Sequence, residues 1–396
     1  MSAVLFWLSV GCIVYTYFGY PLLVTVLAHL HPQKTTPPLP HLPNVTLLIA
    51  AYNEESVIEA KIQNALALDY PKERLQILVV TDGSDDQTPE IVKRYADQGV
   101  DLLHHPQRRG KMAAINRAIP HARGEIVVFS DANNFYHPEA LRQLITPFGD
   151  PRVGAVSGAK TIEKTGSALG TSEGLYWKYE SFLKEQESRL GNCTGVCGEI
   201  LAIRKEAFSP PPTHIINDDF YIAMQVIRQG YRLVYAPEAR SVERVSASAR
   251  DEVTRRTRIN AGRYQAFAHL RHWLPTKHPL LVWQIFSHKF LRLLLPFAMI
   301  GAALSNVFVL FARHPGVRGS LFYLGKPYGE IFLALQSVFY LLAWLGSRFE
   351  RKGRHPLVRL LYLPTFLVNS NLASLRGFIQ FVRGKQTPLW ERVPRG

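Results

Sequence analysis

Charged side chains, cysteines and glycine-rich nucleotide loops are scarce or missing in this sequence of 396 residues. Only 19% of the residues are charged, and the three cysteines are too few for a disulfide framework. Cys193 and Cys197 lack a second pair of zinc ligands nearby, so we expect them to be small core residues. The sequence contains neither Gly-x-Gly-x-x-Gly nor a Walker loop, which excludes the usual dinucleotide-binding and P-loop folds.

Acidic side chains are few in comparison with basic ones. The chain has 31 Asp and Glu against 46 Lys and Arg, a formal net charge of +15. This balance indicates an acidic partner such as nucleic acid, anionic lipid or a sugar nucleotide. Hydrophobic residues make up 47% of the chain and form long runs at both ends, while the middle has the composition of a soluble domain. The distribution favours a membrane-bound enzyme, and we expect no nucleic-acid partner.

No charged side chain occurs in residues 3–28, a stretch long enough to cross a bilayer. No Lys or Arg precedes it and no small-residue cleavage site is evident. We therefore expect a retained membrane helix over residues 1–30 rather than a removed signal peptide. A buried core helix is the alternative. Residues 31–43 are rich in proline and form a predicted stiff linker.

Three apolar runs in the middle of the chain, at 45–51, 75–80 and 126–129, end in polar or acidic residues. Helical patterns separate them, and this alternation predicts an α/β domain with a doubly wound, mostly parallel sheet over residues 44–240. Ligands bind beyond the carboxyl ends of such strands. We therefore expect one ligand at the rim formed by the residues that follow the runs: Asn53, Glu54, Asp82 and Asp131.

Two neighbouring acids, Asp218 and Asp219, follow in an apolar context. Carboxylates are costly in such surroundings unless a metal, a ligand or catalysis requires them. A solvated pair at the start of a helix over residues 220–228 is the alternative, and the local sequence leaves both interpretations open. Three further strands are predicted, at 153–160, 198–204 and 231–236.

A basic amphipathic segment occupies residues 241–285, and a basic tail occupies residues 383–396. Four arginines of the amphipathic segment cluster between positions 255 and 263, while apolar residues recur at helical spacing. This pattern predicts a helix in the membrane interface, with the arginines facing lipid headgroups or an anionic substrate. An ordinary surface helix with a solvated basic face is the alternative.

Long apolar runs return in residues 286–382, the predicted C-terminal membrane region. Residues 293–312 and 321–346 are candidate spans, whereas the weaker run at 360–375 leaves a final crossing open. The loop 347–355 is rich in Arg and Lys, which indicates the cytoplasmic side. We therefore expect a multi-pass protein of the cell membrane with a cytoplasmic catalytic domain.

Taken in order, the polar motifs resemble those of the membrane-integrated members of glycosyltransferase family 2, which include hyaluronan, chitin and cellulose synthases and ceramide glucosyltransferases. The resemblance covers nearly the whole chain and implies a GT-A-type fold. Each motif is weak by itself, but their order and spacing together are specific. The matching motifs are Tyr52-Asn53-Glu54, Asp82-Gly83-Ser84, Gly110-Lys111, Asp131-Ala132-Asn133, Asp218-Asp219 and Arg255-Arg256-Thr257-Arg258-Ile259.

The resemblance implies a role for each matching residue. Asp219 would be the catalytic base, and Asp131 with Asn133 would hold a Mg²⁺ or Mn²⁺ ion. Five residues would bind the nucleotide sugar, the first three in the uridine pocket and the fourth at the diphosphate: Asn53, Glu54, Asp82, Lys111 and Asp131. Three would hold the acceptor or the leaving diphosphate: Asp218, Arg255 and Arg258.

The implied activity is inverting transfer of a sugar from a UDP-sugar to a hydroxyl of a polysaccharide or oligosaccharide, as in exopolysaccharide synthesis. Two alternatives stay open: single transfer to a lipid such as polyprenyl phosphate, a diacylglycerol or a ceramide-like acceptor, and a non-catalytic role in a polysaccharide export assembly. Two positions depart from the family pattern. Asn133 replaces the second acid of Asp-x-Asp, which weakens metal affinity. Ile259 replaces a Trp that stacks on the acceptor sugar, so processive synthesis is not implied.

Overall fold

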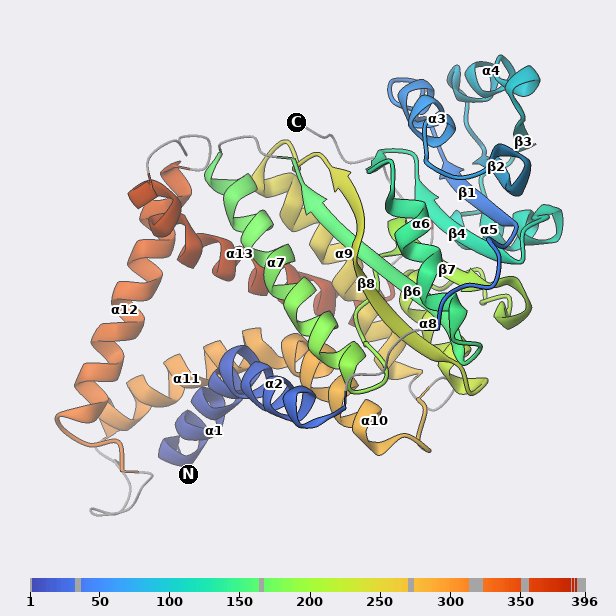
Figure 1. The fold of residues 1–396 in the computed structure, drawn as a ribbon. Coiled ribbons are helices and arrows are strands. Elements are labelled where there is room, and N and C mark those ends of the chain that lie inside the picture. The colour runs from blue at the N-terminus through green and yellow to red at the C-terminus, as the bar shows by residue number, and fades with distance from the viewer. Residues whose placement is uncertain are drawn as a thin grey trace.

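The computed structural model describes residues 2–32, 37–163, 167–269, 274–312, 323–349 and 356–385, together with Thr387 and Leu389. Its central feature is an eight-stranded sheet in the order β3-β2-β1-β4-β7-β6-β8-β5 (Figure 1). The strands are β1 Val45–Ala51, β2 Leu75–Asp82, β3 Val100–His105, β4 Ile126–Asp131, β5 Asn134–Tyr136, β6 Val153–Ile162, β7 Leu201–Arg204 and β8 Arg232–Glu243.

The strands β1 to β4 pair in parallel, as the apolar runs predict. Side chains of β1 are buried on both faces of the sheet, with Leu48 and Ile49 at most 1% exposed, which is why the strand shows no hydrophobic alternation. The register places Ala50 beside Asp131, so the polar ends of β1 and β4 share one edge of the sheet. The sequence did not predict β3, because this edge strand is only half-buried and lacks a continuous apolar run.

The other half of the sheet is mixed rather than parallel. Strand β7 is antiparallel to β4 and β6, β8 is parallel to β6, and the short β5 is antiparallel to β8. Strand β8 continues past the predicted end at residue 236, because its pairing with β6 shifts register and resumes where Ala159 faces Arg240. The segment predicted to be amphipathic from residue 241 therefore begins with the last residues of β8, which ends at Glu243.

Helices cover both faces of the sheet and build a separate core on each. Leu47 and Ile49 of β1 belong to one core and Leu48 and Ala50 to the other, as the alternation of side chains along a strand requires. Helices α3 Ile58–Leu66, α4 Thr88–Lys93 and α6 Ala140–Ile145 contribute to the first core, and α5 Lys111–Ala118 and α8 Asp218–Arg228 to the second. Both buried cysteines lie in these cores, as predicted: Cys193 and Cys197.

Three helical segments of the described residues are long and apolar enough to cross a membrane: Ser2–Leu30, Pro279–Phe311 and Tyr328–Phe349. They contain α1 Ser2–Val14, α2 Tyr20–Leu30, α10 Pro279–Ile285, α11 Leu291–Ala312 and α12 Tyr328–Gly346. Helices α1 and α11 pack side by side, and α1, α2, α11 and α12 gather at the end of the molecule away from β1 to β3 (Figure 1). Apolar side chains remain exposed on the first segment, including Phe18 at 72%, which argues against a buried core helix.

The final helix, α13 Pro356–Val382, contains the weak run at 360–375 but does not meet the length and composition criteria for a span. Residues 350–355 of the basic loop and most of the tail at 383–396 lie outside the described residues. The division of the chain into domains and the cytoplasmic side therefore stay predictions.

Helix α9 Ala249–Ala268 contains the arginine cluster, but two of its arginines do not face outward. Arg255 and Arg256 are ion-paired with Glu252, a buried residue of the same helix, and Arg255 also reaches Glu173. The sequence predicted arginines that face headgroups or an anionic substrate, and these ion pairs turn both guanidinium groups away from headgroups, because buried carboxylates offset the cost of removing them from water. Contact with an anionic substrate stays a prediction. The helix packs along α13, where a Cβ at Gly377 would lie 2.9 Å from the backbone nitrogen of Ala261.

Candidate active site

A cavity of about 810 Å³ lies between the carboxyl ends of β1 and β4 and the arginine-bearing helix α9. Most of the predicted site residues line it: Glu54, Lys111, Asp131, Asn133, Asp218, Asp219, Arg255 and Arg258. Of the described residues predicted for the site, Asn53 and Asp82 lie outside this lining. The structure thus gathers acids and bases from residues 54 to 258 around one space.

Lys111 links the acidic residues of the rim. It is the first residue of α5 and follows Gly110, whose φ of 96° lies in the left-handed region that favours glycine. The Lys111 Nζ lies 2.8 Å from Asp131 Oδ1, at the end of β4, and 3.4 Å from Asp218 Oδ2, at the start of α8. Burial alone would lower the pKa of Lys111, but Asp131 and Asp218 raise it above its ordinary value. The ammonium group is therefore a permanent positive charge at the cavity wall, suited to an anionic ligand.

Asp219 has the chemistry of a general base. Burial, followed by the neighbouring charge of Asp218, raises the pKa of Asp219 from 3.8 to about 6. A carboxylate with such a pKa is ionised at neutral pH but accepts a proton more readily than an ordinary aspartate. The N-cap of α8 is Asn217, whereas Asp219 lies in the first turn and accepts the Phe220 N–H at Oδ1 at 2.7 Å, which lowers its pKa only in part. Gly198 allows the close approach of Asp219, because a Cβ at residue 198 would lie 2.9 Å from the Asp219 Cβ.

Asp82 and Asn53 hold the loops at the edge of the cavity. The buried Asp82 accepts hydrogen bonds at Oδ2 from the backbone N–H groups of Arg109, at 2.8 Å, and Gly110, at 2.7 Å. It therefore fixes the turn that presents Lys111. Asn53, with a φ of 52°, donates from Nδ2 to Asp85 Oδ1 and accepts from the Asp85 N–H, which ties the end of β1 to the loop after β2.

Cations dominate the opposite wall of the cavity. Arg255 donates from Nε to Glu252 Oε2 at 3.0 Å and from Nη2 to Glu173 Oε1 at 3.3 Å, so buried carboxylates of α9 and α7 (Ala168–Arg189) hold its guanidinium group. The other cations that line this wall come from α9 and from a π-helical turn, Phe286–Phe290: Arg258, Arg263 and Lys289. Lys289 Nζ lies 4.0 Å from Glu180 Oε2, a carboxylate that also pairs with Arg292.

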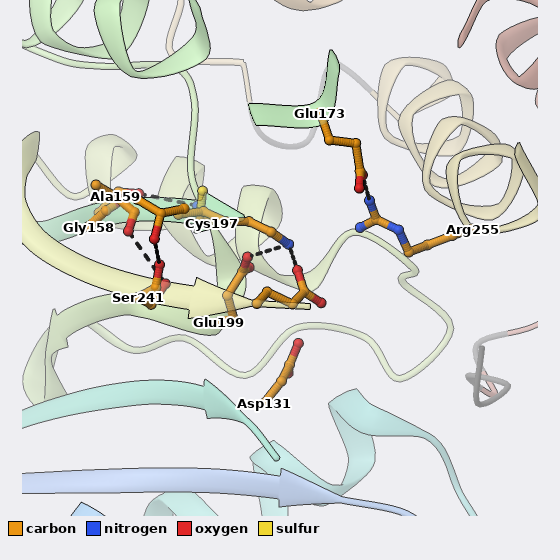
Figure 2. Close-up of polar contacts among 12 residues, drawn as sticks. Asp131, Gly158, Ala159, Glu173, Cys197, Glu199, Ser241 and Arg255 are labelled. Atoms are coloured by element: carbon orange, nitrogen blue, oxygen red, sulfur yellow. Dashed lines mark hydrogen bonds and ion pairs between the residues drawn. The ribbon is translucent and has the colours of Figure 1, made fainter. Parts of the chain in front are cut away.

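Several lining residues were not predicted from the sequence, above all Lys160, Glu199 and Glu243. Lys160 Nζ lies 2.9 Å from the Oε1 of Glu199, which is labelled in Figure 2, and also pairs with Glu243. The sequence held a signal for them, because Lys160 is the last residue of the predicted strand 153–160 and Glu199 is the second residue of the predicted strand 198–204. Both lie in the mixed half of the sheet, whose strand directions the sequence did not reveal.

Asp131 and Asn133, the residues predicted to hold a metal ion, offer oxygen ligands at one side of the cavity. Both line the cavity, but the described residues contain no group of three His, Cys, Asp or Glu side chains placed to hold a metal ion. Mg²⁺ is commonly bound by one or two carboxylates together with substrate phosphates. The residues present fit an ion that completes its coordination with a bound diphosphate, rather than an ion held by protein ligands alone.

Asp131 at the end of β4, Lys111 at the start of the preceding helix α5, and the carboxylate of Asp219 with its raised pKa meet at one cavity. This arrangement suits an enzyme that transfers a group from a nucleoside diphosphate donor. Residues 46–209 match the family model described as Glycosyl transferase family 2. This segment, which runs from β1 to β7, is therefore similar to a glycosyltransferase family 2 domain.

Two curated relatives are polysaccharide synthases. The poly-beta-1,6-N-acetyl-D-glucosamine synthase of Staphylococcus aureus (strain COL) is 30% identical over 207 residues, which cover 50% of this chain and 49% of the relative. The synthase of the same name from Staphylococcus epidermidis is 28% identical over 204 residues, with coverage of 49% and 48%. The chain spans about half the length of the curated relatives it matches.

A solved structure is similar over the full length. The mannosyltransferase PcManGT from Pyrobaculum calidifontis, in complex with GDP-Man and Mn²⁺, aligns with a TM-score of 0.73 and 25% identity. The alignment covers 98% of this chain and 100% of the mannosyltransferase. The fold is thus the GT-A type that the sequence predicted.

Proposed function

We propose that this protein is an inverting membrane glycosyltransferase that moves a sugar from a UDP-sugar to a hydroxyl of a polysaccharide or oligosaccharide acceptor. The observation that carries the proposal is the meeting of Asp219, Lys111 and Asp131 at one cavity. The match of residues 46–209 to the family and the polysaccharide synthases among the relatives support it.

Asp219 removes the proton from the acceptor hydroxyl, whose oxygen attacks the anomeric carbon of the donor sugar. The bond from that carbon to the diphosphate breaks, and the Lys111 ammonium group balances the charge of the leaving diphosphate. A Mg²⁺ or Mn²⁺ ion at Asp131 and Asn133 would, when bound, neutralise the same diphosphate. A positioned general base contributes about 10²–10⁴-fold to such a rate.

The buried state of Asp82 bears on the choice of donor. Its Oδ2 accepts from the Arg109 and Gly110 N–H groups, its Oδ1 lies 3.6 Å from Arg117 Nη1, and the side chain is fully buried, so recognition of uracil by Asp82 requires the carboxylate to become exposed. The full-length structural neighbour was solved with a guanosine nucleotide sugar. An experiment that screens donors must therefore include UDP-N-acetylglucosamine, UDP-glucose and GDP-mannose.

A second candidate, single transfer to a lipid acceptor, is favoured by where the cavity ends. The lining includes Lys289, which lies within the candidate membrane span Pro279–Phe311. An acceptor held at this end of the cavity would approach from the membrane side. Ile259, which lines the same wall, offers no aromatic face to a growing glycan.

The test uses detergent-purified protein. Release of the nucleoside diphosphate, UDP or GDP, is measured for each donor with and without Mn²⁺. We expect release with one donor, a requirement for divalent metal, and weaker metal-dependent nucleotide binding in Asp131→Ala. A ladder of products indicates polymer synthesis, and a single lipid-soluble product indicates single transfer. Absence of release with every donor and acceptor would support the non-catalytic role instead.

We further propose that the three candidate spans anchor the enzyme in the cell membrane with its sheet on the cytoplasmic side. Protease added to sealed inverted vesicles should then cleave the sheet domain, while protease added to intact cells should not. The opposite pattern would contradict this orientation.

A further inference from the structure

Glu199 lies in the cavity without a role in the mechanism described above. It belongs to the short turn Gly198–Ile200 that leads into β7, and its side chain is only 13% exposed. Gly198, its neighbour in the chain, packs against the Asp219 side chain. In Figure 2 the Asp131 carboxylate points toward the glutamate cluster that contains Glu199. Glu199 therefore lines the cavity together with the general base Asp219 and with Asp131 at the end of β4.

Lys160 keeps the Glu199 carboxylate charged and oriented. Its Nζ lies 2.9 Å from Glu199 Oε1, and its side chain is only 4% exposed. Burial alone would raise the pKa of Glu199, but the Lys160 ammonium outweighs it and lowers the pKa to about 2. An ionised carboxylate accepts hydrogen bonds and donates none. Glu199 is thus ionised at neutral pH and acts there only as a hydrogen-bond acceptor.

The reaction geometry determines which part of a substrate meets this acceptor. The anomeric carbon must lie between the hydroxyl activated by Asp219 and the diphosphate held at Lys111, so the hexose ring occupies the space between these residues. Glu199 lines that same space. A buried carboxylate at a sugar ring is matched by hydroxyl groups, which are its natural donors.

We infer that Glu199, positioned by Lys160, forms a subsite that binds a ring hydroxyl of the transferred hexose and so selects the donor sugar. The inference rests on the proposed function and adds to it the residue that distinguishes one sugar from another. Lys160 is a positioning residue here, since it acts through Glu199.

The experiment asks whether Glu199 and one ring hydroxyl of the donor sugar contribute to the same interaction. The donor that the native enzyme accepts is compared with its analogues lacking one ring hydroxyl each, using the native enzyme and Glu199→Gln, and kcat/KM is measured for each pair. We expect one analogue to lose about 10–100-fold with the native enzyme, as for a hydrogen bond to a charged group. The same analogue should lose less than about 3-fold with Glu199→Gln, because the bond is already weakened.

Controls separate a binding role from a structural one. Glu238→Gln, at an exposed glutamate paired with Arg240, should leave the analogue pattern of the native enzyme unchanged. Nucleotide affinity and thermal unfolding of Glu199→Gln report whether the variant is folded, and if it is not, Glu199→Asp is used in the same comparison. Equal analogue losses in the native enzyme and a folded variant would overturn the inference. A native enzyme that turns over no donor would instead overturn the proposed function.

Discussion

The two ends of the cavity are built in different ways. At the strand end, the acids Asp131, Asp218 and Asp219 surround Lys111, and their positions follow from the ends of β4 and the starts of α5 and α8. At the helix end, cations from α9 and the turn Phe286–Phe290 line the wall, held by carboxylates of α7 and α9.

Because of this difference, we expect the donor sugar nucleotide and the acceptor to depend on different ends of the cavity. The strand end depends on hydrogen-bonded register within one sheet, which fixes the position of its side chains relative to the donor. The helix end depends on packing among α7, α9, α13 and a segment that lies within a candidate membrane span. We therefore expect changes at the strand end to affect donor chemistry and changes at the helix end to affect the acceptor.

Asp219→Asn should produce the largest effect. The amide keeps the shape of the side chain but cannot accept the proton, so kcat should fall by about 10²–10⁴-fold while nucleotide affinity stays close to native. Initial rates and calorimetric titration with the nucleotide measure both quantities. Near-native turnover in this variant would remove Asp219 from the role of base.

Lys111→Met tests the other half of the strand end. The change removes the ammonium group that lies against Asp131 and Asp218, and it leaves the leaving diphosphate without this counter-charge. We expect kcat/KM for the donor to fall by about 10–100-fold, the range for a charge-assisted bond. Lys111→Arg should recover part of the loss. A Lys111→Met variant with a raised acceptor KM and a native kcat/KM for the donor would contradict the assignment of the strand end to the donor.

Lys289→Met addresses the helix end. Lys289 belongs to the turn Phe286–Phe290 and lies 4.0 Å from Glu180 of α7, so we expect the acceptor KM to rise about 10-fold while donor hydrolysis without acceptor is unchanged. Lys277→Met, at an exposed lysine close in sequence, is the matched control and should behave as native. A loss of donor hydrolysis in Lys289→Met would show that the two ends do not act separately.

The smallest effect is a shift in pH dependence. Asp219 must be ionised to accept a proton, so kcat/KM should fall as pH decreases through about 6, where its raised pKa lies. Asp218→Asn removes a like charge that raises this pKa, and the acid limb should move to lower pH by less than about one unit. The exposed Asp97→Asn should leave the limb in place. An acid limb that moves upward in Asp218→Asn would contradict the electrostatic explanation.

The sequence predicted the strand end better than the helix end. The apolar runs that become β1, β2 and β4 are buried on both faces, so composition alone revealed them, and parallel pairing then placed Asp131 at the rim. Strand β5 has only three residues and gave no such signal. The antiparallel β7 depends on pairing between residues about 75 apart, as for Val128 and Ala202, which no local pattern encodes.

By itself the sequence determined the strands β1, β2 and β4, the apolar segments and the order of the motifs, because burial on both faces leaves a local pattern in the chain. Only the tertiary structure decided that Asp82 faces a backbone turn rather than the cavity, and that Glu252 and Glu173 bury the guanidinium of Arg255. It also brought Lys160 against Glu199. These outcomes depend on pairs of side chains from distant segments, and the partner of a buried charge is chosen by packing rather than by its neighbours in sequence.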